Sequence, residues 1–304
     1  MAVSLFTHPD MLEHRPGTGH PERPERLSAV LAALKGERGV EPIAACLATR
    51  ADLDLVHDAA FVQALCEAAP EDGLVYLDPD TALSPGSLTA ARRAAGAVAD
   101  AVRNVARGES QRAFCAVRPP GHHAEPARAM GFCLFSNIAI GARIAQAEGL
   151  QRVAVVDFDV HHGNGTQAVV ERDESLFFAS VHQWPAYPGT GRPSERGLGN
   201  VVNAVASPGA PREAWRVAFE SLMPALDAFA PELVLISAGF DAHARDPLAE
   251  QRLEAEDYAW ATRAIAVVAR KHAKGRIVSS LEGGYDLEAL GASALAHVRA
   301  LGED

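Results

Sequence analysis

Short apolar runs alternate with longer amphipathic, alanine-rich segments from about residue 27 to the end of the chain. The short runs predict strands, and the segments with a helical period predict the helices that connect them. The predicted strands are 113–117, 153–159, 176–181, 233–237 and 276–281. The predicted helices are 23–35, 87–108, 137–149, 212–229, 256–273 and 286–301. This alternation indicates an α/β fold in which helices cover both faces of a central, mostly parallel β-sheet.

No internal repeat, low-complexity tract or long Pro/Gly/Ser linker interrupts the pattern, which predicts a single domain over residues 1–304. Polar segments rich in Gly and Pro follow or adjoin the predicted strands. They cover residues 77–87, 118–132, 182–200, 238–249 and 282–287. Because sites in open parallel sheets form at the carboxyl ends of the strands, we expect these segments to carry the functional residues.

Composition narrows the functional class. The 39 acidic residues outnumber the 28 basic ones, giving a formal net charge of -11. This charge disfavours a broad basic surface for nucleic acid and suits a cationic partner. The four cysteines form no C-x-x-C pair, so they indicate neither a disulfide framework nor a cysteine-rich zinc site. With no signal-peptide pattern and no apolar stretch of membrane-spanning length, the sequence predicts a soluble cytoplasmic protein.

Ionisable side chains cluster where the apolar run 153–156 ends. Side chains alternate along a strand, so Asp157, Asp159 and His161 are expected to point to one side. Asp159 and His161 can then bind one ion, and Asp241, just beyond a second apolar strand, offers a third ligand. Capped strand ends with hydrogen-bonded histidines are the alternative for any one of these residues. Two carboxylates and one imidazole leave coordination positions open, as a catalytic metal site requires.

A second pair of histidines follows the strand at 113–117. The residues Pro119, Pro120 and Gly121 predict a rigid turn that displays His122 and His123 side by side. Such a pair can simply be surface residues, but it can also transfer protons in metal-assisted hydrolysis. Further along, Tyr285 lies on a predicted loop at the same edge, where its hydroxyl could donate to a developing oxyanion.

Five segments, "RPPGHHAE", "GFCLFSN", "DFDVHHGNGTQ", "AGFDAH" and "LEGGYD", occur in this order. Together they resemble the metal-dependent histone deacetylase and acetylpolyamine amidohydrolase family, particularly its class II and bacterial members. The segments "HPERPERL" and "DPDTALSPGS" extend the resemblance over nearly the whole chain. The resemblance implies an arginase/deacetylase-like fold and one deacetylase-like catalytic domain.

The resemblance also implies roles for individual residues. It implies zinc ligands at Asp159, His161 and Asp241, and the oxygen- and nitrogen-rich set admits ferrous iron as well. The implied catalytic set consists of the two histidines, the carbonyl-polarising tyrosine and the groups behind the histidines: His122, His123, Tyr285, Asp157 and Asn164. In that set Asp157 orients His122, whereas Asn164 stands behind His123 where many class I members have an aspartate. His162, despite its position, is not an implied ligand.

Other matches concern the substrate and a second cation. Gly131 and Phe132 match one wall of an acyl-lysine tunnel, and Tyr187 matches the opposing aromatic. Asp80 lies near the family's rim carboxylate, and Arg26 falls where an arginine lines an internal acetate path. A structural K⁺ site is implied at Asp157, Ser180 and Val181, with main-chain oxygens of Asp159 and His161.

The resemblance implies zinc-dependent removal of acetyl or other acyl groups from acylated amines. An arginase-like dinuclear manganese ureohydrolase is the first alternative, although Gly163 and His243 stand where its additional carboxylates would be required. A catalytically silent module that binds acyl-lysine is the second. The expected partner is a peptide or small-molecule acylated amine such as acetyl-lysine or an acetylpolyamine, without nucleic acid or membrane. The sequence also allows a homo-oligomer.

Overall fold

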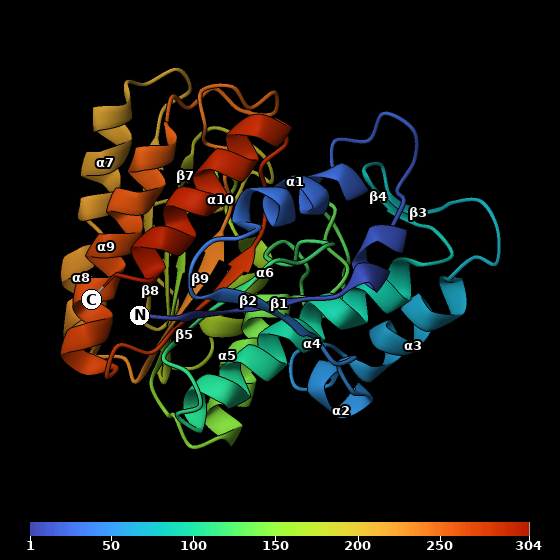
Figure 1. Cartoon of the computed structure of the whole chain (residues 1–304), viewed down its shortest axis with the longest axis horizontal. Helices are drawn as coiled ribbons and strands as arrows, with labels where there is room; N and C mark the ends of the chain where they lie inside the picture. Colours follow the sequence, from blue (N-terminus) through green and yellow to red (C-terminus); the bar gives the residue numbers. More distant parts are fainter. Residues whose placement is uncertain (304) are drawn as a thin grey trace.

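A central sheet lies between two layers of helices in the computed structural model, which describes residues 1–303 (Figure 1). Every strand pair in this sheet is parallel. In sheet order the strands are β2 (Val40–Ala44), β1 (Val3–Thr7), β5 (Arg112–Cys115), β10 (Ile277–Leu281), β9 (Leu233–Ala238), β6 (Val153–Asp157), β7 (Leu176–Gln183) and β8 (Val201–Ala206). The expected α/β fold is confirmed.

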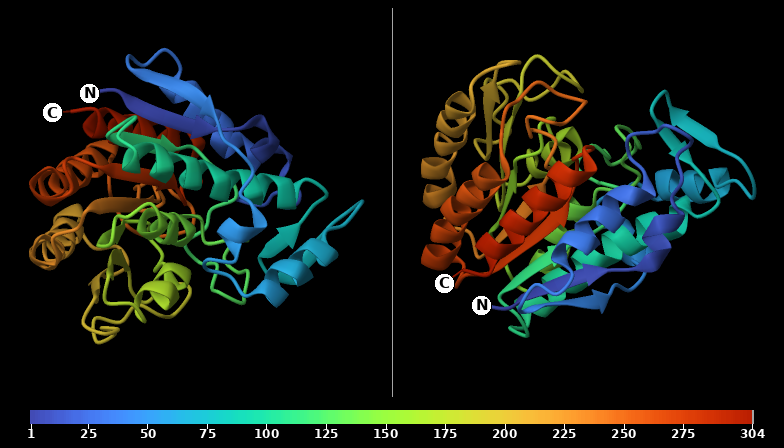
Figure 2. Two further views of the ribbon diagram at one scale, coloured as in Figure 1. Left: turned by 90° about the horizontal axis from the view of Figure 1, so that it is seen from below. Right: turned by 45° about the horizontal axis from the view of Figure 1, so that its top comes forward.

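The helices divide between the two faces of the sheet. One face is covered by α4 (Ser87–Ala106) and α5 (Asn137–Ala147), which pack on each other and on the central strands. The other face carries α1 (Pro24–Leu34), α7 (Arg212–Glu220), α8 (Met223–Phe229), α9 (Ala255–His272) and α10 (Leu287–Leu301). The shorter helices are η1 (Pro9–Glu13), α2 (Arg50–Leu53), α3 (Ala59–Ala68) and α6 (Asn164–Val170). Figure 2 shows α3 and a small hairpin at the end of the molecule remote from the termini.

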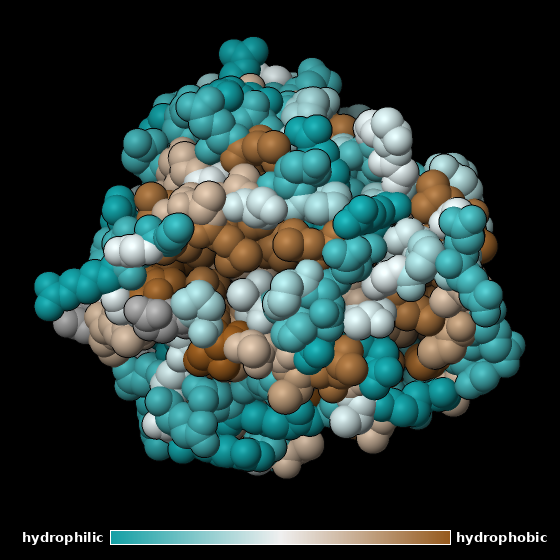
Figure 3. Space-filling view, turned by 45° about the vertical axis from the view of Figure 1, so that its right-hand side comes forward, coloured by the Kyte–Doolittle hydropathy of each residue, from teal (hydrophilic) through white to brown (hydrophobic). Residues whose placement is uncertain are grey.

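The central strands are buried on both faces. All residues of β5, β6, β7, β9 and β10 are buried, as expected for parallel strands under two helical layers. Hydrophilic residues dominate the face drawn in Figure 3, with apolar side chains gathered over its middle. Within residues 1–303, no helix is long and apolar enough to cross a membrane.

Several elements differ from the sequence-based prediction. The predicted helix 212–229 is two helices, because Pro224 at the start of α8 has no amide hydrogen to continue the helical ladder. The segment 77–87, predicted as a loop, contains most of the antiparallel hairpin of β3 (Val75–Asp78) and β4 (Thr81–Leu83). The strands β1, β2 and β8 were not predicted from the sequence.

The sheet order explains why the polar segments meet. The segments after β5, β10, β9, β6 and β7 leave five consecutive neighbours in the sheet. Because these strands are parallel, all five segments emerge at the same edge. The functional residues predicted on them are therefore brought to one place, as the strand-end argument requires.

Candidate metal centre and catalytic pocket

Three predicted ligands meet at the carboxyl ends of β6 and β9. One potential ligand atom from each of Asp159, His161 and Asp241 lies within 4.8 Å of the others. The His161 Nδ1 atom is 3.1 Å from Asp241 Oδ2 and 3.2 Å from Asp159 Oδ1. Their side chains are buried or nearly so. The donor set of two carboxylates and one imidazole suits a divalent cation such as zinc or ferrous iron.

The path of the chain at this site corrects one detail of the prediction. The strand β6 ends at Asp157 instead of residue 159, so strand alternation does not place the ligands. The chain bends because side-chain oxygens accept from nearby amides: Asp157 Oδ1 from Asp159 N at 3.0 Å, and Asp159 Oδ1 from His161 N at 2.9 Å. The carboxylates therefore shape the turn that collects the ligands.

Two glycines make room for the ligand carboxylates. A Cβ atom on Gly239 would lie 2.0 Å from Asp159 Oδ2, and one on Gly283 would lie 2.2 Å from Asp241 Oδ2. The Gly283 amide also donates to Asp159 Oδ2 at 2.8 Å. Any side chain at either glycine would displace a carboxylate, so the main chain itself forms part of the cradle.

The two buried carboxylates at this centre favour a positive charge between them. Burial disfavours a charged imidazole, yet hydrogen bonds from His161 to Asp159 and Asp241 raise the His161 pKa to about 10. With the protein groups alone, the positive charge between the two buried carboxylates is thus a proton on His161. A divalent cation would supply this charge instead and would bind the neutral imidazole.

The tandem histidines lie beside the metal centre with different partners. The His122 Nδ1 atom is 3.0 Å from Asp157 Oδ2, and His123 Nδ1 is 2.8 Å from Asn164 Oδ1. The other end of the Asn164 amide donates to Glu125 Oε1 at 2.7 Å. Because a carboxylate only accepts, this bond orients the amide with its oxygen toward His123. The proton of neutral His123 is then on Nδ1, which leaves its Nε2 atom able to accept.

Because their surroundings differ, the pKa values of His122 and His123 shift in opposite directions. Burial disfavours the charged form of both rings. For His122, the neighbouring charges of Asp159 and Asp157 outweigh burial and raise its pKa to about 10. For His123, burial and the positive charges of His122 and His161 hold the pKa well below its usual range. The pair therefore combines a cationic imidazole with a neutral one.

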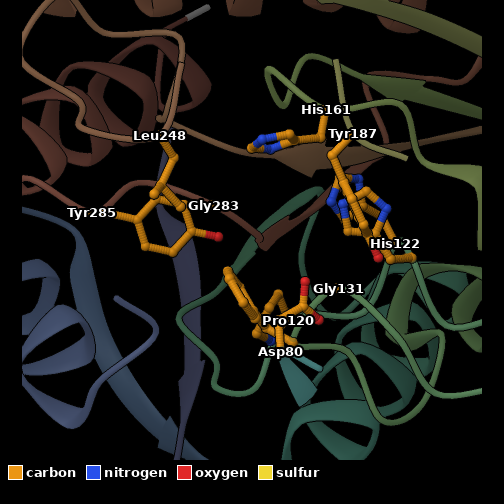
Figure 4. Close-up of a pocket in the computed structure, with 11 residues that line it drawn as sticks. Asp80, Pro120, His122, Gly131, His161, Tyr187, Leu248, Gly283 and Tyr285 are labelled. Carbon is orange, nitrogen blue, oxygen red and sulfur yellow. The ribbon is translucent and has the colours of Figure 1, made fainter. Parts of the chain in front are cut away.

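A cavity of about 200 Å³ opens beside the three ligands (Figure 4). Its lining contains the tandem histidines, one metal ligand, several aromatic rings and one carboxylate: Asp80, Pro120, His122, His123, Gly131, Phe132, His161, Tyr187, Leu248, Gly283 and Tyr285. In Figure 4 the Tyr285 hydroxyl points toward the histidine side of the cavity. The residues predicted for substrate binding and catalysis thus share one pocket, with Asp157 and Asn164 behind it.

Aromatic and acidic groups form the outer part of this pocket. The Tyr187 ring stands edge-on to His123 with centroids 5.1 Å apart, and Phe132 is edge-on to Tyr285 at 5.9 Å. Asp80 occupies the turn between β3 and β4. Burial and the neighbouring Asp78 raise the Asp80 pKa.

The remaining predicted residues lie outside the cavity. The Arg26 guanidinium is 4.8 Å from the centre of the Tyr285 ring and donates to the main-chain oxygens of Glu282 and Gly284. Ser180 is buried opposite Asp157 in the sheet register, with its hydroxyl 2.9 Å from His182 Nδ1. Val181 is the next residue of β7. The K⁺ site at these positions stays a prediction.

His162 and the two positions compared with dinuclear enzymes have other surroundings. The His162 Nδ1 and Nε2 atoms lie 2.8 Å from Thr190 Oγ1 and Gln167 Oε1, so neither ring nitrogen is available as a ligand. A Cβ atom on Gly163 would be 2.2 Å from Asp157 Oδ2. His243 Nε2 is 3.5 Å from Glu254 Oε2. Among residues 1–303, one cluster of potential metal ligands is found, that of Asp159, His161 and Asp241.

Two buried carboxylates next to the site were not predicted from the sequence. Asp246 accepts from the amides of Tyr285 and Leu248, at 2.7 and 3.0 Å. Glu282 Oε2 accepts from Gly121 N at 2.7 Å and from His122 N at 3.2 Å. Burial raises the Glu282 pKa to about 7. Both lie in polar segments after strands, the same signal that singled out Asp157, but their partners are far away in the sequence.

Replacing Gly131 by alanine is expected to impair both folding and the position of His123. Gly131 has a φ of +57°, and a Cβ atom there would lie 2.5 Å from the His123 ring. The left-handed backbone alone costs an L-residue about 1–2 kcal/mol. We therefore expect a larger loss of unfolding free energy than this, with lower turnover.

Gly209→Ala is the matched control. Gly209 has a φ of +70°, but a Cβ atom there would meet nothing within 4 Å. Urea unfolding of both variants separates the backbone cost from the collision. Equal losses of stability in the two variants would show that His123 yields to the new methyl group without strain.

Comparisons with known proteins identify the family. Residues 20–301 match the family model described as the histone deacetylase domain. A probable deacetylase from Archaeoglobus fulgidus is 36% identical over 302 residues, covering 95% of this chain and 82% of that protein. A histone deacetylase-like amidohydrolase from Pseudomonas aeruginosa is 39% identical over 277 residues, covering 88% and 73%.

Solved structures agree with the sequence relatives. The crystal structure of the HDA15 HD domain superposes with a TM-score of 0.92 at 36% identity, covering 99% of this chain and 89% of that one. The cluster of Asp159, His161 and Asp241 is consistent with the metal site of such proteins. The chain therefore belongs to the histone deacetylase family.

Proposed function

We propose that this protein is a zinc-dependent amidohydrolase that removes acetyl or other acyl groups from acylated amines. The observation that carries the proposal is one pocket, beside a three-ligand metal cluster, that is lined by two histidines with different hydrogen-bond partners and by a tyrosine. Asp159, His161 and Asp241 would hold the ion, and ferrous iron could take its place. When bound, the ion supplies Lewis-acid chemistry that polarises the acyl carbonyl and activates water.

The histidine pair is proposed to manage the protons. His123 is the neutral member, and Asn164 leaves its Nε2 atom free to accept a proton from the attacking water. The same proton can then pass to the departing amine. His122, held by Asp157, keeps a positive charge next to the reacting carbonyl. The pair thus offers a base and an electrostatic stabiliser within one turn.

Tyr285 is proposed to act on the acyl oxygen. Its hydroxyl faces the histidines across the cavity, where the carbonyl oxygen gains negative charge as water adds. Burial raises the pKa of the Tyr285 hydroxyl, so the group stays protonated and able to donate at neutral pH. Asp246 fixes the main chain of this residue by accepting from its amide.

The pocket walls indicate the kind of substrate. Phe132, Tyr187 and Leu248 provide apolar surface for an alkyl chain, while Asp80 at the wall can accept from a peptide amide or an ammonium group. A lysine side chain and a polyamine both place an alkyl chain before the acylated nitrogen. We therefore propose acetyl-lysine peptides and acetylpolyamines as the substrate classes, bound by one catalytic domain.

A hydrolysis screen tests this function against its alternatives. Purified protein would be assayed with acetyl-lysine peptides, acetylpolyamines and longer acyl amides, and its metal content would be measured on the same sample. Amide hydrolysis with one ion per chain is the expected result. Two tightly bound manganese ions with urea release would support an arginase-like enzyme instead. Binding of acylated amines without hydrolysis by metal-loaded protein would support a silent binding module.

A further inference from the structure

One wall of the pocket is carried by a long loop. Residues 184–200, here named the Tyr187 loop, connect β7 to β8. The Tyr187 side chain is 40% exposed, and its hydroxyl has no hydrogen-bond partner among residues 1–303. The Tyr187 ring packs edge-on against His123 and His161, but it has no hydrogen bond that fixes its distance from the opposite wall. The main chain of the loop therefore contributes to setting that distance.

Hydrogen bonds among Glu195, Gln167, His162 and Thr190 hold the loop against α6, and their geometry identifies the donor and the acceptor in each bond. The Glu195 carboxylate accepts from Gln167 Nε2 at 2.8 Å, which turns the Gln167 amide oxygen toward His162. That oxygen lies 2.8 Å from His162 Nε2, so this ring nitrogen carries the proton. The other ring nitrogen, His162 Nδ1, must then accept from the hydroxyl of Thr190 at 2.8 Å.

A second set of contacts packs the loop against the imidazole rings of His162 and His182. Glu195 also accepts from the amides of Gly191 and Arg192, and the Gly191 carbonyl oxygen is 2.9 Å from His182 Nε2. A Cβ atom on Gly191 would lie 2.4 Å from the His162 ring and 2.6 Å from His182 Nε2. The loop can reach this position only without a side chain at residue 191.

The same helix positions the proposed base. Asn164 and Gln167 are both on α6, less than one turn apart. Asn164 bonds to His123, and Gln167 bonds to His162. Neither Gln167, Thr190 nor Glu195 lines the cavity. The helix therefore connects the histidine pair to the loop that carries Tyr187 through residues that lie outside the cavity lining.

We infer that Gln167, Thr190 and Glu195 are positioning residues that determine substrate fit, because they hold the Tyr187 loop on His162 and so fix the width of the pocket. This inference rests on the proposed deacylase function for its kinetic part. Its structural part does not depend on any activity. Substitutions that release the loop should weaken substrate binding while leaving the reacting groups in place.

Three variants at exposed positions test the inference. Thr190→Val keeps the shape of the side chain but removes the hydroxyl, and Thr190→Ser keeps the hydroxyl. Ser194→Ala changes an exposed residue of the same loop whose side chain makes no hydrogen bond within residues 1–303. Glu195→Gln is a second release variant, should Thr190→Val fold poorly. Thermal unfolding and metal content would first be compared with the parent protein.

Limited trypsin digestion gives a readout that is independent of activity. Arg196 is exposed in the Tyr187 loop and is followed by Gly197, so release of the loop exposes this bond to cleavage. We expect Thr190→Val and Glu195→Gln to be cut after Arg196 roughly fivefold faster, the factor that corresponds to one ordinary hydrogen bond. Thr190→Ser and Ser194→Ala should be cut at the parental rate. Equal rates in all variants would overturn the inference.

Kinetics test the second half of the inference. For an acetyl-lysine peptide, we expect KM to rise roughly fivefold in Thr190→Val with kcat within about twofold of the parent, and Thr190→Ser to restore KM. Faster cleavage with an unchanged KM would overturn the role in substrate fit. If the parent itself hydrolyses no acyl amide, the proposed function fails, while the trypsin comparison still decides whether these bonds hold the loop.

Discussion

Tyr285→Phe is expected to lower kcat by about 10²- to 10³-fold while metal content and the free energy of unfolding stay nearly unchanged. The tyrosine ring is held by contacts that the substitution keeps. It packs edge-on against Phe132, and the Arg26 guanidinium lies 4.8 Å from its centre. Its main-chain amide donates to Asp246. Phenylalanine should therefore occupy the same place.

The hydroxyl of Tyr285 is the only group that this substitution removes. It has no hydrogen-bond partner among residues 1–303, so its loss leaves no protein group unsatisfied. The side chain is 8% exposed and borders the cavity, which leaves the substrate as the natural acceptor. The effect should hence fall on the rate of the chemical step and not on stability.

Tyr258→Phe is the matched control for this prediction. Tyr258 is fully buried on α9, its hydroxyl also lacks a partner in the described chain, and it does not line the cavity. Steady-state kinetics, metal analysis and urea unfolding would be measured for both variants. Unchanged turnover in Tyr285→Phe would remove Tyr285 from the mechanism, and equal losses in both variants would point to an indirect effect.

Asp241→Asn is expected to abolish metal binding. Because the ion's Lewis-acid chemistry is then lost, turnover should fall at least about 10³-fold. The Asp241 carboxylate contributes one oxygen to the cluster and accepts from the Val160 amide with the other, at 2.9 Å. Asparagine preserves the shape of the side chain and can keep the bond to Val160. What it removes is the negative charge that a divalent cation needs.

The stability of this variant should respond differently to chelation. Burial and the nearby charge of Asp159 raise the Asp241 pKa even though His161 is hydrogen-bonded to both carboxylates, which means that the ionised Asp241 is disfavoured in the metal-free protein. The metal-free variant should thus be at least as stable as the metal-free parent. The parent should gain about 2.7 kcal/mol when free metal reaches 100 times its Kd, whereas the variant should gain almost nothing.

Metal analysis and thermal unfolding with and without a chelator test these expectations. Asp80→Asn serves as control, because Asp80 lines the cavity but does not belong to the ligand cluster, and this variant should retain its metal. A parental metal content in Asp241→Asn would be incompatible with the assigned ligand set. So would a parent protein whose unfolding temperature does not change on chelation.

The sequence was most informative where a pattern has a local cause. The strands β5, β6, β7, β9 and β10 are buried along their whole length, and all five were predicted from apolar runs in the sequence. The strands of this sheet that were missed, β1, β2 and β8, lie at or near its two edges, and β1 and β8 each contain positions that are only partly buried. The break between α7 and α8 also has a local cause, Pro224. The prediction missed this break because the helical spacing of apolar residues continues on both sides of the proline.

The site shows the same division. Asp159, His161 and Asp241 could be predicted as a set because each follows an apolar strand, and parallel strands end at one edge. Which atoms face one another could not be predicted. The orientation of the Asn164 amide depends on Glu125, 39 residues away, and the seat of the Tyr187 loop depends on the bond between His162 and Thr190.

The sequence was therefore enough to predict the α/β class and to single out the candidate ligands, the histidine pair and the tyrosine, because burial and strand-end position leave marks on neighbouring residues. Only the tertiary structure decided that Asp246 holds Tyr285, that Glu282 holds the turn before His122, and that α6 connects His123 to the pocket wall. The physical reason is that a hydrogen bond between distant segments depends on directions and distances of a few tenths of an ångström. These are fixed by packing across the whole sheet and leave no periodic signal in the chain.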